Sequence, residues 1–424
     1  MKKKIVALVL VLALAASLAI GLAACNDPDN SQLVFGPEDA DITFGMICLH
    51  DENSTYDANF INAARELAAS KNVRVIIKTG IPESDVCYNA AADLVDQGCD
   101  VIFADSFGHE TYIMQAAREF PDVEFAHATG TYAHTENLSN FHNGFATIYE
   151  GRYLAGVVAG YELNEMIANG EITADQAKMG YVAAFPYAEV VSGYTSFYLG
   201  AKSVCPSVTM EVRYTGSWYD ETAERSTAEA LIEADCVLIS QHADSSGAPT
   251  ACEEANGGAG VPNVTYNVAF PGNSTYLVGS RINWTPYFEY IIDQMRAGEE
   301  IDADWTGDLS TSSVLLLEYG AGVSAEVKTA VEAVLAELEA GTRKVFDVST
   351  FTVSVITGST NSGATVDEDG HLTAYMADVN TDSAYTADTQ VIKTENGITY
   401  FSESDFRSAP YFDVRIDGIT EINN

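Results

Sequence analysis

The stretch Leu49-His50-Asp51-Glu52-Asn53-Ser54-Thr55-Tyr56-Asp57-Ala58-Asn59-Phe60 decides the fold. The apolar run 42–49 is typical of a buried strand, and the apolar residues from Tyr56 to Leu67 recur at helical spacing. The polar cluster therefore lies between the carboxyl end of a strand and the amino end of a helix, where ligands bind in open α/β sheets. A helix cap accounts for only one of these residues. We expect ligand-binding residues here at Asp51, Asn53, Tyr56, Asp57 and Phe60.

The first 24 residues have the pattern of an export signal. Lys2-Lys3-Lys4 precedes an apolar stretch that ends in Leu22-Ala23-Ala24-Cys25. This arrangement resembles a bacterial lipoprotein signal, cleaved before a lipid-carrying Cys25; an ordinary signal peptide or a first transmembrane helix is the alternative. Residues 25–40 would then form a polar tether. No later stretch holds the roughly 20 apolar residues that span a bilayer, so we expect a lipid anchor at the extracytoplasmic face of the cell membrane.

The chain is strongly acidic, with a formal net charge of −40 over 424 residues. Such a chain repels polyanions, which excludes DNA and RNA as partners. Anionic lipid headgroups are disfavoured for the same reason, so membrane contact is expected through the anchor only. The length and the hydrophobic content of 47% suffice for two or three domains with their own cores.

Six cysteines follow Cys25, and no two of them have CxxC spacing. They are Cys48, Cys87, Cys99, Cys205, Cys236 and Cys252. Since a His-rich cluster is also lacking, we expect neither a zinc site nor a cofactor. Oxidising surroundings permit disulfides, whereas Cys48, Cys99 and Cys236 lie in or beside apolar runs that suit buried thiols. The sequence leaves the pairing open.

Strands and helices alternate in two successive runs. The first run has expected strands at 42–49, 73–77, 101–104, 123–126 and around Phe145, with helices at 83–97 and 110–120. After a helix over 150–168, the second run has strands at 179–184, 208–214, 237–240 and 264–266, with helices at 190–203, 221–234 and 284–295. This alternation is typical of doubly wound parallel sheets. Two such runs predict two α/β lobes that face each other across a cleft and are joined by a hinge.

The expected domain boundaries follow from these runs. We place lobe I at 41–146 and 283–310, and lobe II at 147–282 and 311–344. From residue 345 onward, short alternating runs are separated by turn clusters such as 358–363. This pattern predicts a C-terminal β-rich extension over 345–424.

Three further strand exits carry polar or aromatic residues. They are Ser106 and Phe107 in lobe I, and Phe185, Tyr187, His242 and Asp244 in lobe II. Because parallel strands end at one edge of their sheet, these side chains should face the cleft. A capped helix start explains Ser106 equally well. Glu150 opens a helix at the crossing between the lobes, where the helix dipole favours an acid as much as a binding role does.

Five motifs follow one another in a characteristic order. They are the lipobox 22–25, the polar loop 51–60, Glu150-Gly151-Arg152-Tyr153-Leu154-Ala155-Gly156, the run 193–201 and Thr215-Gly216-Ser217-Trp218-Tyr219-Asp220. Together they resemble the basic membrane protein (BMP) family of ABC-transporter substrate-binding lipoproteins, over about residues 42–297. The resemblance implies a type I periplasmic-binding-protein fold, a small nucleoside-like ligand and an ABC permease as partner. The C-terminal extension departs from the shorter members of the family.

The resemblance also implies roles for particular residues. The family holds a base between two aromatic rings, one from each lobe. Here Tyr56 or Phe60 would be the first ring and Trp218 the second, while Asp51 or Asn53 would read the edge of the base. Stacking contributes about 1–3 kcal/mol per base, and fixed polar groups supply the discrimination.

The chain departs from the family pattern at the ribose-binding positions. Asn267 stands where the family has an Asp, and Asn283 is the nearest match to the family's Lys, with Arg281 as an offset cation. These departures leave a purine nucleoside, a modified nucleoside, a free base or another small polar molecule as the expected ligand.

We therefore expect an extracytoplasmic, lipid-anchored receptor that delivers a nucleoside or similar heterocycle to an ABC permease. A receptor of the same fold for a sugar derivative or a signalling molecule is the alternative. An anchored hydrolase is the rival from another class, because His242 and Asp244 are neighbours in sequence. The chain has no G-x-S-x-G elbow, so we expect no enzymatic activity.

Overall fold

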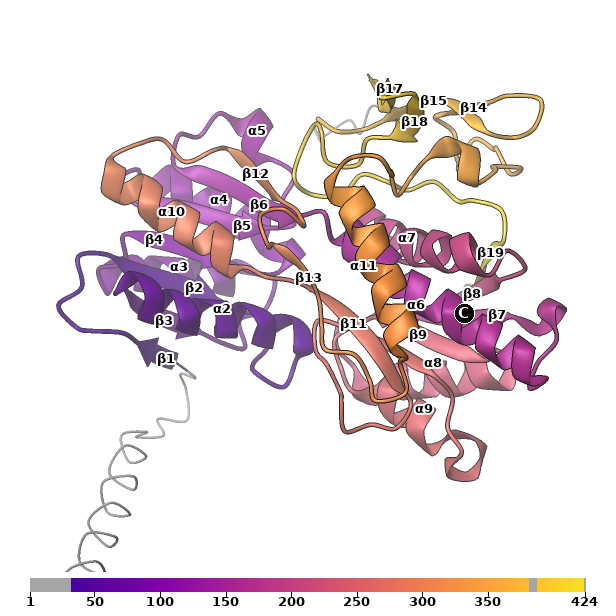
Figure 1. Ribbon diagram of the computed structural model, residues 1–424. Coiled ribbons are helices and arrows are strands. Elements are labelled where there is room, and N and C mark those ends of the chain that lie inside the picture. The colour runs from indigo at the N-terminus through magenta and orange to yellow at the C-terminus, as the bar shows by residue number, and fades with distance from the viewer. Residues whose placement is uncertain (1–31, 381–386, 423–424) are drawn as a thin grey trace, which may run out of the picture.

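Two seven-stranded sheets carry the fold, and each lies at the centre of one lobe (Figure 1). The structure is a computed structural model that describes residues 32–380 and 387–422. The expected lipoprotein signal 1–24 and Cys25 lie outside this part of the chain. Within these described ranges, no helix is both long enough and apolar enough to cross a membrane.

The sheet of lobe I has the order β1-β3-β2-β4-β5-β6-β12, and every neighbouring pair is parallel except β1 with β3. Its strands are β1 (Gln32–Phe35), β2 (Thr43–Ile47), β3 (Arg74–Lys78), β4 (Val101–Ala104), β5 (Glu124–Ala128), β6 (Phe141–Ala146) and β12 (Asp304–Gly307). Its helices are α2 (Thr55–Lys71), α3 (Asp85–Asp96), the short η1 (Phe107–His109), α4 (Glu110–Glu119), α5 (Ala133–Glu136) and α10 (Thr285–Ala297).

The sheet of lobe II has the order β13-β11-β10-β9-β7-β8-β19, and β13 is its one antiparallel strand among the described residues. Its strands are β7 (Lys178–Ala183), β8 (Thr209–Tyr214), β9 (Leu238–His242), β10 (Asn263–Tyr266), β11 (Tyr276–Ile282), β13 (Val314–Leu316) and β19 (Ile419–Ile422). Its helices are α6 (Ile148–Asn169), η2 (Ala174–Gln176), α7 (Ala188–Val204), α8 (Glu221–Glu233), α9 (Gly247–Gly258) and α11 (Ala325–Glu339).

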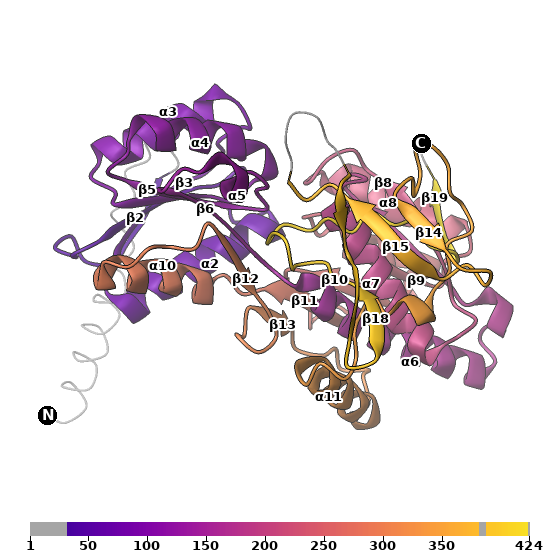
Figure 2. The ribbon, with the colours of Figure 1, turned by 90° about the horizontal axis from the view of Figure 1, so that it is seen from above.

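The chain passes between the lobes at three points: after Ala146, after Ile282 and after Gly307. Figure 2 shows the two lobes side by side with these connections between them. Three connecting segments instead of one linker are typical of a hinge that lets two lobes close over a ligand.

The packing of α6 against α7 explains the glycines of two sequence motifs, 150–156 and 193–201. A Cβ atom on Gly156 would lie 2.0 Å from the carbonyl oxygen of Phe197, and one on Gly200 would lie 2.0 Å from that of Tyr153. Only glycine permits this approach of two helix backbones. The close packing also fixes α6 beneath the sheet of lobe II, where Arg152 is fully buried.

The extension forms two small sheets and then rejoins lobe II. Its elements are η3 (Val348–Thr350), β14 (Ala364–Val366), β15 (Leu372–Ala377), β16 (Thr389–Gln390), β17 (Ile392–Glu395) and β18 (Ile398–Phe401). It also reaches lobe I, where Ser408 donates its backbone N–H to Asp304 Oδ1 at 2.7 Å. The extension therefore contacts both lobes.

Two short strands lie where other structure was expected. Residues 32–35, expected in the tether, form edge strand β1 and pair with β3. Residues 419–422, expected in the separate extension, form β19 and extend the sheet of lobe II alongside β8. Both strands pair with residues far away in the chain, so local periodicity does not reveal them.

Candidate ligand-binding site

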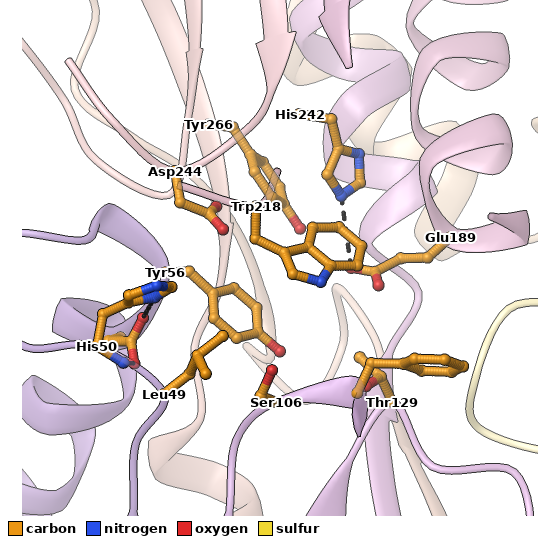
Figure 3. Close-up of a pocket in the computed structure, with 12 residues that line it drawn as sticks. Leu49, His50, Tyr56, Ser106, Thr129, Glu189, Trp218, His242, Asp244 and Tyr266 are labelled. Atoms are coloured by element: carbon orange, nitrogen blue, oxygen red, sulfur yellow. Dashed lines mark hydrogen bonds and ion pairs between the residues drawn. The ribbon is translucent and has the colours of Figure 1, made fainter. Parts of the chain in front are cut away.

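An inner cavity lies between the lobes, at the carboxyl ends of their strands (Figure 3). It contains about 400 Å³ of empty space, part of it open to solvent. Its lining comes from Leu49, His50, Tyr56, Asp57, Ser106, Phe107 and Thr129 in lobe I, and from Glu189, Trp218, His242, Asp244 and Tyr266 in lobe II. Parallel sheets place their ligand sites at this edge.

The lobes are closed around this cavity. The backbone N–H of Thr55 donates to the backbone carbonyl of Asp244 at 2.8 Å. The rings of His50 and Tyr219 lie 5.4 Å apart, centroid to centroid. These contacts join opposite lobes, so they exist only while the cleft is shut.

The loop before α2 holds its polar side chains through the helix cap. Ser54 caps α2, and its hydroxyl donates to Asp57 Oδ2 at 2.6 Å. The backbone N–H of His50 donates to Asp57 Oδ1 at 2.7 Å. Burial opposes the charge of Asp57, but the hydrogen bonds from His50 and Ser54 outweigh it and lower the pKa of this carboxyl.

Tyr56 projects into the inner cavity from the first turn of α2. Its hydroxyl donates to the backbone carbonyl of Asp105 at 2.9 Å. One turn later Phe60 is completely buried and stacks on Trp284, with ring centroids 4.4 Å apart. Tyr56 is therefore the aromatic ring that this helix offers to a ligand, whereas Phe60 belongs to the core of lobe I.

Trp218 supplies an aromatic ring from lobe II. Phe185 meets it edge-on at a centroid distance of 5.1 Å, and Tyr187 lies 6.0 Å from it. Phe185 and Tyr187 therefore support the indole and do not line the inner cavity. Figure 3 shows Trp218 and Tyr56 as neighbours that reach the cavity from opposite lobes.

Asp244 offers its side-chain carboxyl group to the inner cavity. It is 5% exposed, and no group of the described chain donates a hydrogen bond to its carboxylate. Burial, together with the charges of Glu224, Asp57 and Glu189, raises the pKa of Asp244 well above its usual value. A ligand that donates a hydrogen bond would satisfy this buried group.

His242 and Glu189 form a second polar pair in the inner cavity. Nε2 of His242 lies 3.4 Å from Oε1 of Glu189, and the imidazole is 4.5 Å from the ring of Tyr266. Burial lowers the pKa of His242, although the contact with Glu189 partly opposes this. The ring is therefore neutral, and its Nδ1 has no hydrogen-bond partner in the described structure.

A buried cation lies behind this wall of the cavity. The guanidinium of Arg152 is 5.5 Å from the ring centroid of Tyr266 and donates to Ser240 Oγ at 2.8 Å. It also donates to the carbonyl oxygen of Thr265 at 3.2 Å. Arg152 thus fixes the strand ends that carry Tyr266 and His242, without itself lining the cavity.

One group of described residues has metal-ligand chemistry. The ligand atoms of Cys48, Asp57 and Asp105 lie within 4.8 Å of one another. Both oxygens of Asp57 already accept hydrogen bonds, and Asp105 Oδ1 accepts one from the Leu49 N–H at 3.1 Å. Burial and the charge of Asp57 raise the pKa of Asp105 well above its usual value. A protonated Asp105 fits beside an ionised Asp57, so we assign no metal here.

Seven of the residues predicted from the sequence meet at the inner cavity. They are Tyr56, Asp57, Ser106, Phe107, Trp218, His242 and Asp244. Five further lining residues had not been predicted: Leu49, His50, Thr129, Glu189 and Tyr266. Tyr266 ends β10, Thr129 directly follows β5, and Leu49 and His50 lie within three residues of the end of β2, so the position just after a strand is the signal that could have identified these four residues.

The other predicted residues lie elsewhere. Asp51 and Asn53 are exposed and bond each other, with Asn53 Nδ2 donating to Asp51 Oδ1 at 2.9 Å. Glu150 accepts a hydrogen bond from Thr147 at the start of α6.

Asn267 and Asn283 also lie outside the cavity lining. Asn267 adopts a left-handed backbone (φ 64°) and donates its N–H to the Ser280 carbonyl. Asn283 donates to the Ser312 carbonyl beside the hinge, at 3.1 Å. A local hydrogen bond therefore accounts for the side-chain amide of Asn283, whereas the buried Nδ2 of Asn267 has no hydrogen-bond partner in the described structure.

The six described cysteines are all buried and free. The open question of their pairing is therefore answered in favour of thiols for Cys48, Cys87, Cys99, Cys205, Cys236 and Cys252.

Comparison with known proteins places the chain in a family. Residues 49–334 match the family model of Bmp, described as "ABC transporter substrate-binding protein PnrA-like". The chain belongs to this family. The resemblance seen in the sequence is thus confirmed, and the family is one of solute-binding proteins and not of enzymes.

Two relatives carry names that mention a ligand. A Haloferax volcanii protein, named for glucose binding in an ABC transporter, is 37% identical over 55% of this chain and 56% of its own length. A Brucella abortus purine-binding protein is 35% identical over 62% of this chain and 66% of its own length. The chain thus spans somewhat more than half of these relatives.

Solved structures agree with the fold. An ABC-transporter solute-binding protein of Aeropyrum pernix K1 has a TM-score of 0.61 at 16% identity, covering 72% of this chain and 93% of that one. A solute-binding protein from Conexibacter woesei has a TM-score of 0.55 at 21% identity, covering 72% and 98%. These likenesses confirm the periplasmic-binding-protein fold predicted from the sequence.

Proposed function

We propose that this member of the Bmp family is the extracytoplasmic, lipid-anchored receptor of an ABC importer, and that it binds a purine nucleoside or similar heterocycle. The observation that carries the proposal is the pair of rings, Tyr56 and Trp218, which enter one cavity from opposite lobes. A flat heterocycle between two such rings gains stacking energy whatever its substituents. The purine-binding relative from Brucella abortus supports the same ligand class.

The polar groups of the inner cavity favour a ligand that donates hydrogen bonds. Glu189 and Asp244 supply acceptor oxygens, whereas both oxygens of Asp57 already accept from His50 and Ser54, and none of the described lining residues is Lys or Arg. Amino groups, ring N–H groups and hydroxyls fit such a lining, whereas a phosphate would meet uncompensated negative charge. A nucleoside fits this lining and a nucleotide does not.

Closure is the proposed mechanism of capture. The Thr55–Asp244 hydrogen bond and the two-sided contact with the ligand become available only when the lobes meet. A ligand that contacts both lobes therefore shifts the equilibrium toward the closed state. The closed form is then the species that presents both lobes to a permease.

A sugar is the second candidate ligand, supported by the glucose-binding relative from Haloferax volcanii. Sugar hydroxyls also donate to carboxylates, and the apolar face of a pyranose packs on aromatic rings. Since the two ligand classes share this chemistry, a direct comparison has to separate them.

Calorimetry with the protein lacking residues before Asn26 makes that comparison, with nucleosides, bases and sugars as ligands. We expect a nucleoside to bind and to be recovered unchanged, and replacement of Trp218 by Ala to weaken binding about 10-fold or more. Trp218→Phe, which keeps a ring, should retain most of the affinity. Binding of sugars alone would overturn the nucleoside assignment, and hydrolysis of the bound nucleoside would establish the hydrolase.

A further inference from the structure

A second and larger cavity adjoins the inner one, and the C-terminal extension builds much of its wall. This outer cavity contains about 1950 Å³ of empty space, including space open to solvent, compared with about 400 Å³ for the inner cavity. Its wall includes the loop 359–363, strand β15 and the segment 407–415. The extension therefore does more than pack against the lobes: it encloses space next to the cleft.

The two cavities are contiguous. Phe107, Thr129, Glu189 and Trp218 line both of them. At this boundary Phe107 of lobe I stacks on Tyr187 of lobe II with ring centroids 5.5 Å apart. Both rings are unusually exposed for their size, at 43% and 45%. A ligand held by Trp218 could extend past this pair into the outer cavity without leaving the protein.

The outer cavity presents charges of both signs. Arg415 donates through Nε to Glu421 Oε1 at 3.2 Å and through Nη1 to the Asp413 carbonyl at 2.5 Å. These bonds use two of the five N–H groups of the guanidinium, and no hydrogen bond from Nη2 to the described chain is present, so Nη2 remains available to a ligand. The exposed Asp413 side chain lines the same space and accepts from the Tyr375 hydroxyl.

Acids outnumber bases in this lining. Its acids are Glu189, Asp378, Asp413 and Glu421, and its bases are Arg407 and Arg415. This balance disfavours a phosphate, because an anion would meet excess negative charge. It suits a group that is uncharged and polar, or one that carries both charges itself.

We propose that the outer cavity is a second compartment of the ligand site and receives a polar, uncharged or zwitterionic substituent of a nucleoside-like ligand. The inference rests on the proposed nucleoside binding and narrows it to extended nucleosides. It also gives the extension a role, since the loop 359–363 and the segment 407–415 then determine specificity.

Calorimetry on the full chain tests the compartment, with adenosine, S-adenosylhomocysteine, N6-(2-hydroxyethyl)adenosine and AMP as probes. S-adenosylhomocysteine carries a zwitterionic chain at the 5′ carbon, and the N6 compound carries an uncharged chain at the base. We expect at least one of these two to bind about 10-fold more tightly than adenosine, equivalent to 1.4 kcal/mol. AMP should bind more weakly than adenosine.

A blocking substitution locates the effect. Ser362 is exposed and lines the outer cavity only, so Ser362→Trp should abolish the advantage of the extended probe and leave adenosine binding unchanged. Ser359→Trp is a second blocking variant in the same loop. Thr365→Trp is the matched control, since Thr365 is an exposed residue of β14 outside the cavity lining.

The outcomes separate the inference from the function on which it rests. If adenosine binds through Trp218 but neither extended probe binds more tightly, the second compartment is overturned and the nucleoside receptor stands. Equal effects of Ser362→Trp and Thr365→Trp would overturn it as well. If no nucleoside binds at all, both proposals fail together.

Discussion

The backbone N–H of Thr55 in lobe I donates a hydrogen bond of 2.8 Å to the backbone carbonyl of Asp244 in lobe II. Thr55 is the first residue of α2, and its neighbour Tyr56 lines the inner cavity together with Asp244. The hydrogen bond that holds the lobes closed is therefore made by residues at or next to the cavity lining of each lobe.

Replacing Thr55 with Pro should weaken ligand binding about 10-fold or more, because closure loses this bond and leaves a buried carbonyl without a donor. Proline is tolerated at the first position of a helix, so α2 itself should persist. Ala325→Pro at the first position of α11 is the matched control. Calorimetry would give the affinities, and X-ray scattering with saturating ligand would show whether the lobes close. Unchanged affinity in Thr55→Pro would contradict the role of this bond.

Asp244→Asn should make the protein more stable and bind its ligand less well. Since burial raises the pKa of Asp244, the folded protein holds this proton more tightly than the unfolded chain does. Stability is therefore lost as pH rises above the usual Asp range, and the variant avoids this loss. Binding should fall about 10-fold or more, because the NH2 group of Asn replaces one acceptor oxygen and would face a donor of the ligand.

The matched control for Asp244→Asn is Asp51→Asn, which lies in an exposed loop outside the inner cavity. Melting curves from pH 4 to 8, together with calorimetry, would measure both effects of each substitution. If Asp51→Asn lost as much affinity as Asp244→Asn, the assignment of Asp244 to the binding site and of Asp51 to its outside would be contradicted.

Glu110→Gln should flatten the dependence of stability on pH. Burial raises the pKa of Glu110 from 4.5 to about 7, so the folded protein binds its proton more tightly. The free energy of unfolding then decreases as pH rises from about 4.5 to 7, by up to ~3 kcal/mol. Gln keeps an oxygen for the N–H groups of Thr131 and Tyr132, which donate at 2.7 and 2.9 Å.

Urea titrations at pH 4.5 and 7 would measure this difference, with Glu165→Gln on the exposed face of α6 as the control. The control should follow the wild type at both pH values. If Glu110→Gln also follows it, then Glu110 does not titrate between these values.

The protein lacking residues before Asn26 should show no reactive thiols in its native state. All six described cysteines are buried and free, and burial raises the pKa of Cys252 to about 12. Buried thiols with raised pKa values react slowly because the thiolate is the nucleophile. A thiol reagent such as DTNB should therefore detect six thiols in denaturant without reductant. Fewer than six would reveal disulfides.

The opening stretch shows what the sequence could and could not predict. The strand, the polar loop and the helix follow from hydrophobic spacing, and all three form. The choice between Tyr56 and Phe60 does not follow, because residues four apart share one helix face. Only the position of Trp284, which covers Phe60, decides that Tyr56 is the ring that meets the cavity.

The far side of the site was harder to predict. Glu189 and Tyr266 reach the inner cavity because lobe II is folded and closed against lobe I, a relationship that no local pattern contains. Asp51 and Asn53 fail as lining residues for the opposite reason, since their own hydrogen bond keeps them in an exposed turn. The residue types in the sequence predicted the polar and aromatic chemistry of the site. Tertiary contacts determine which of these residues line the inner cavity.

The pairing of β19 with β8 has a consequence for biosynthesis. Lobe II receives this strand from residues 419–422, which are more than 200 residues away from β8 in the chain. Without this strand the edge of β8 exposes unpaired backbone groups, which are a template for pairing with another chain. A chain that ends before Ile419 would therefore be aggregation-prone at this edge.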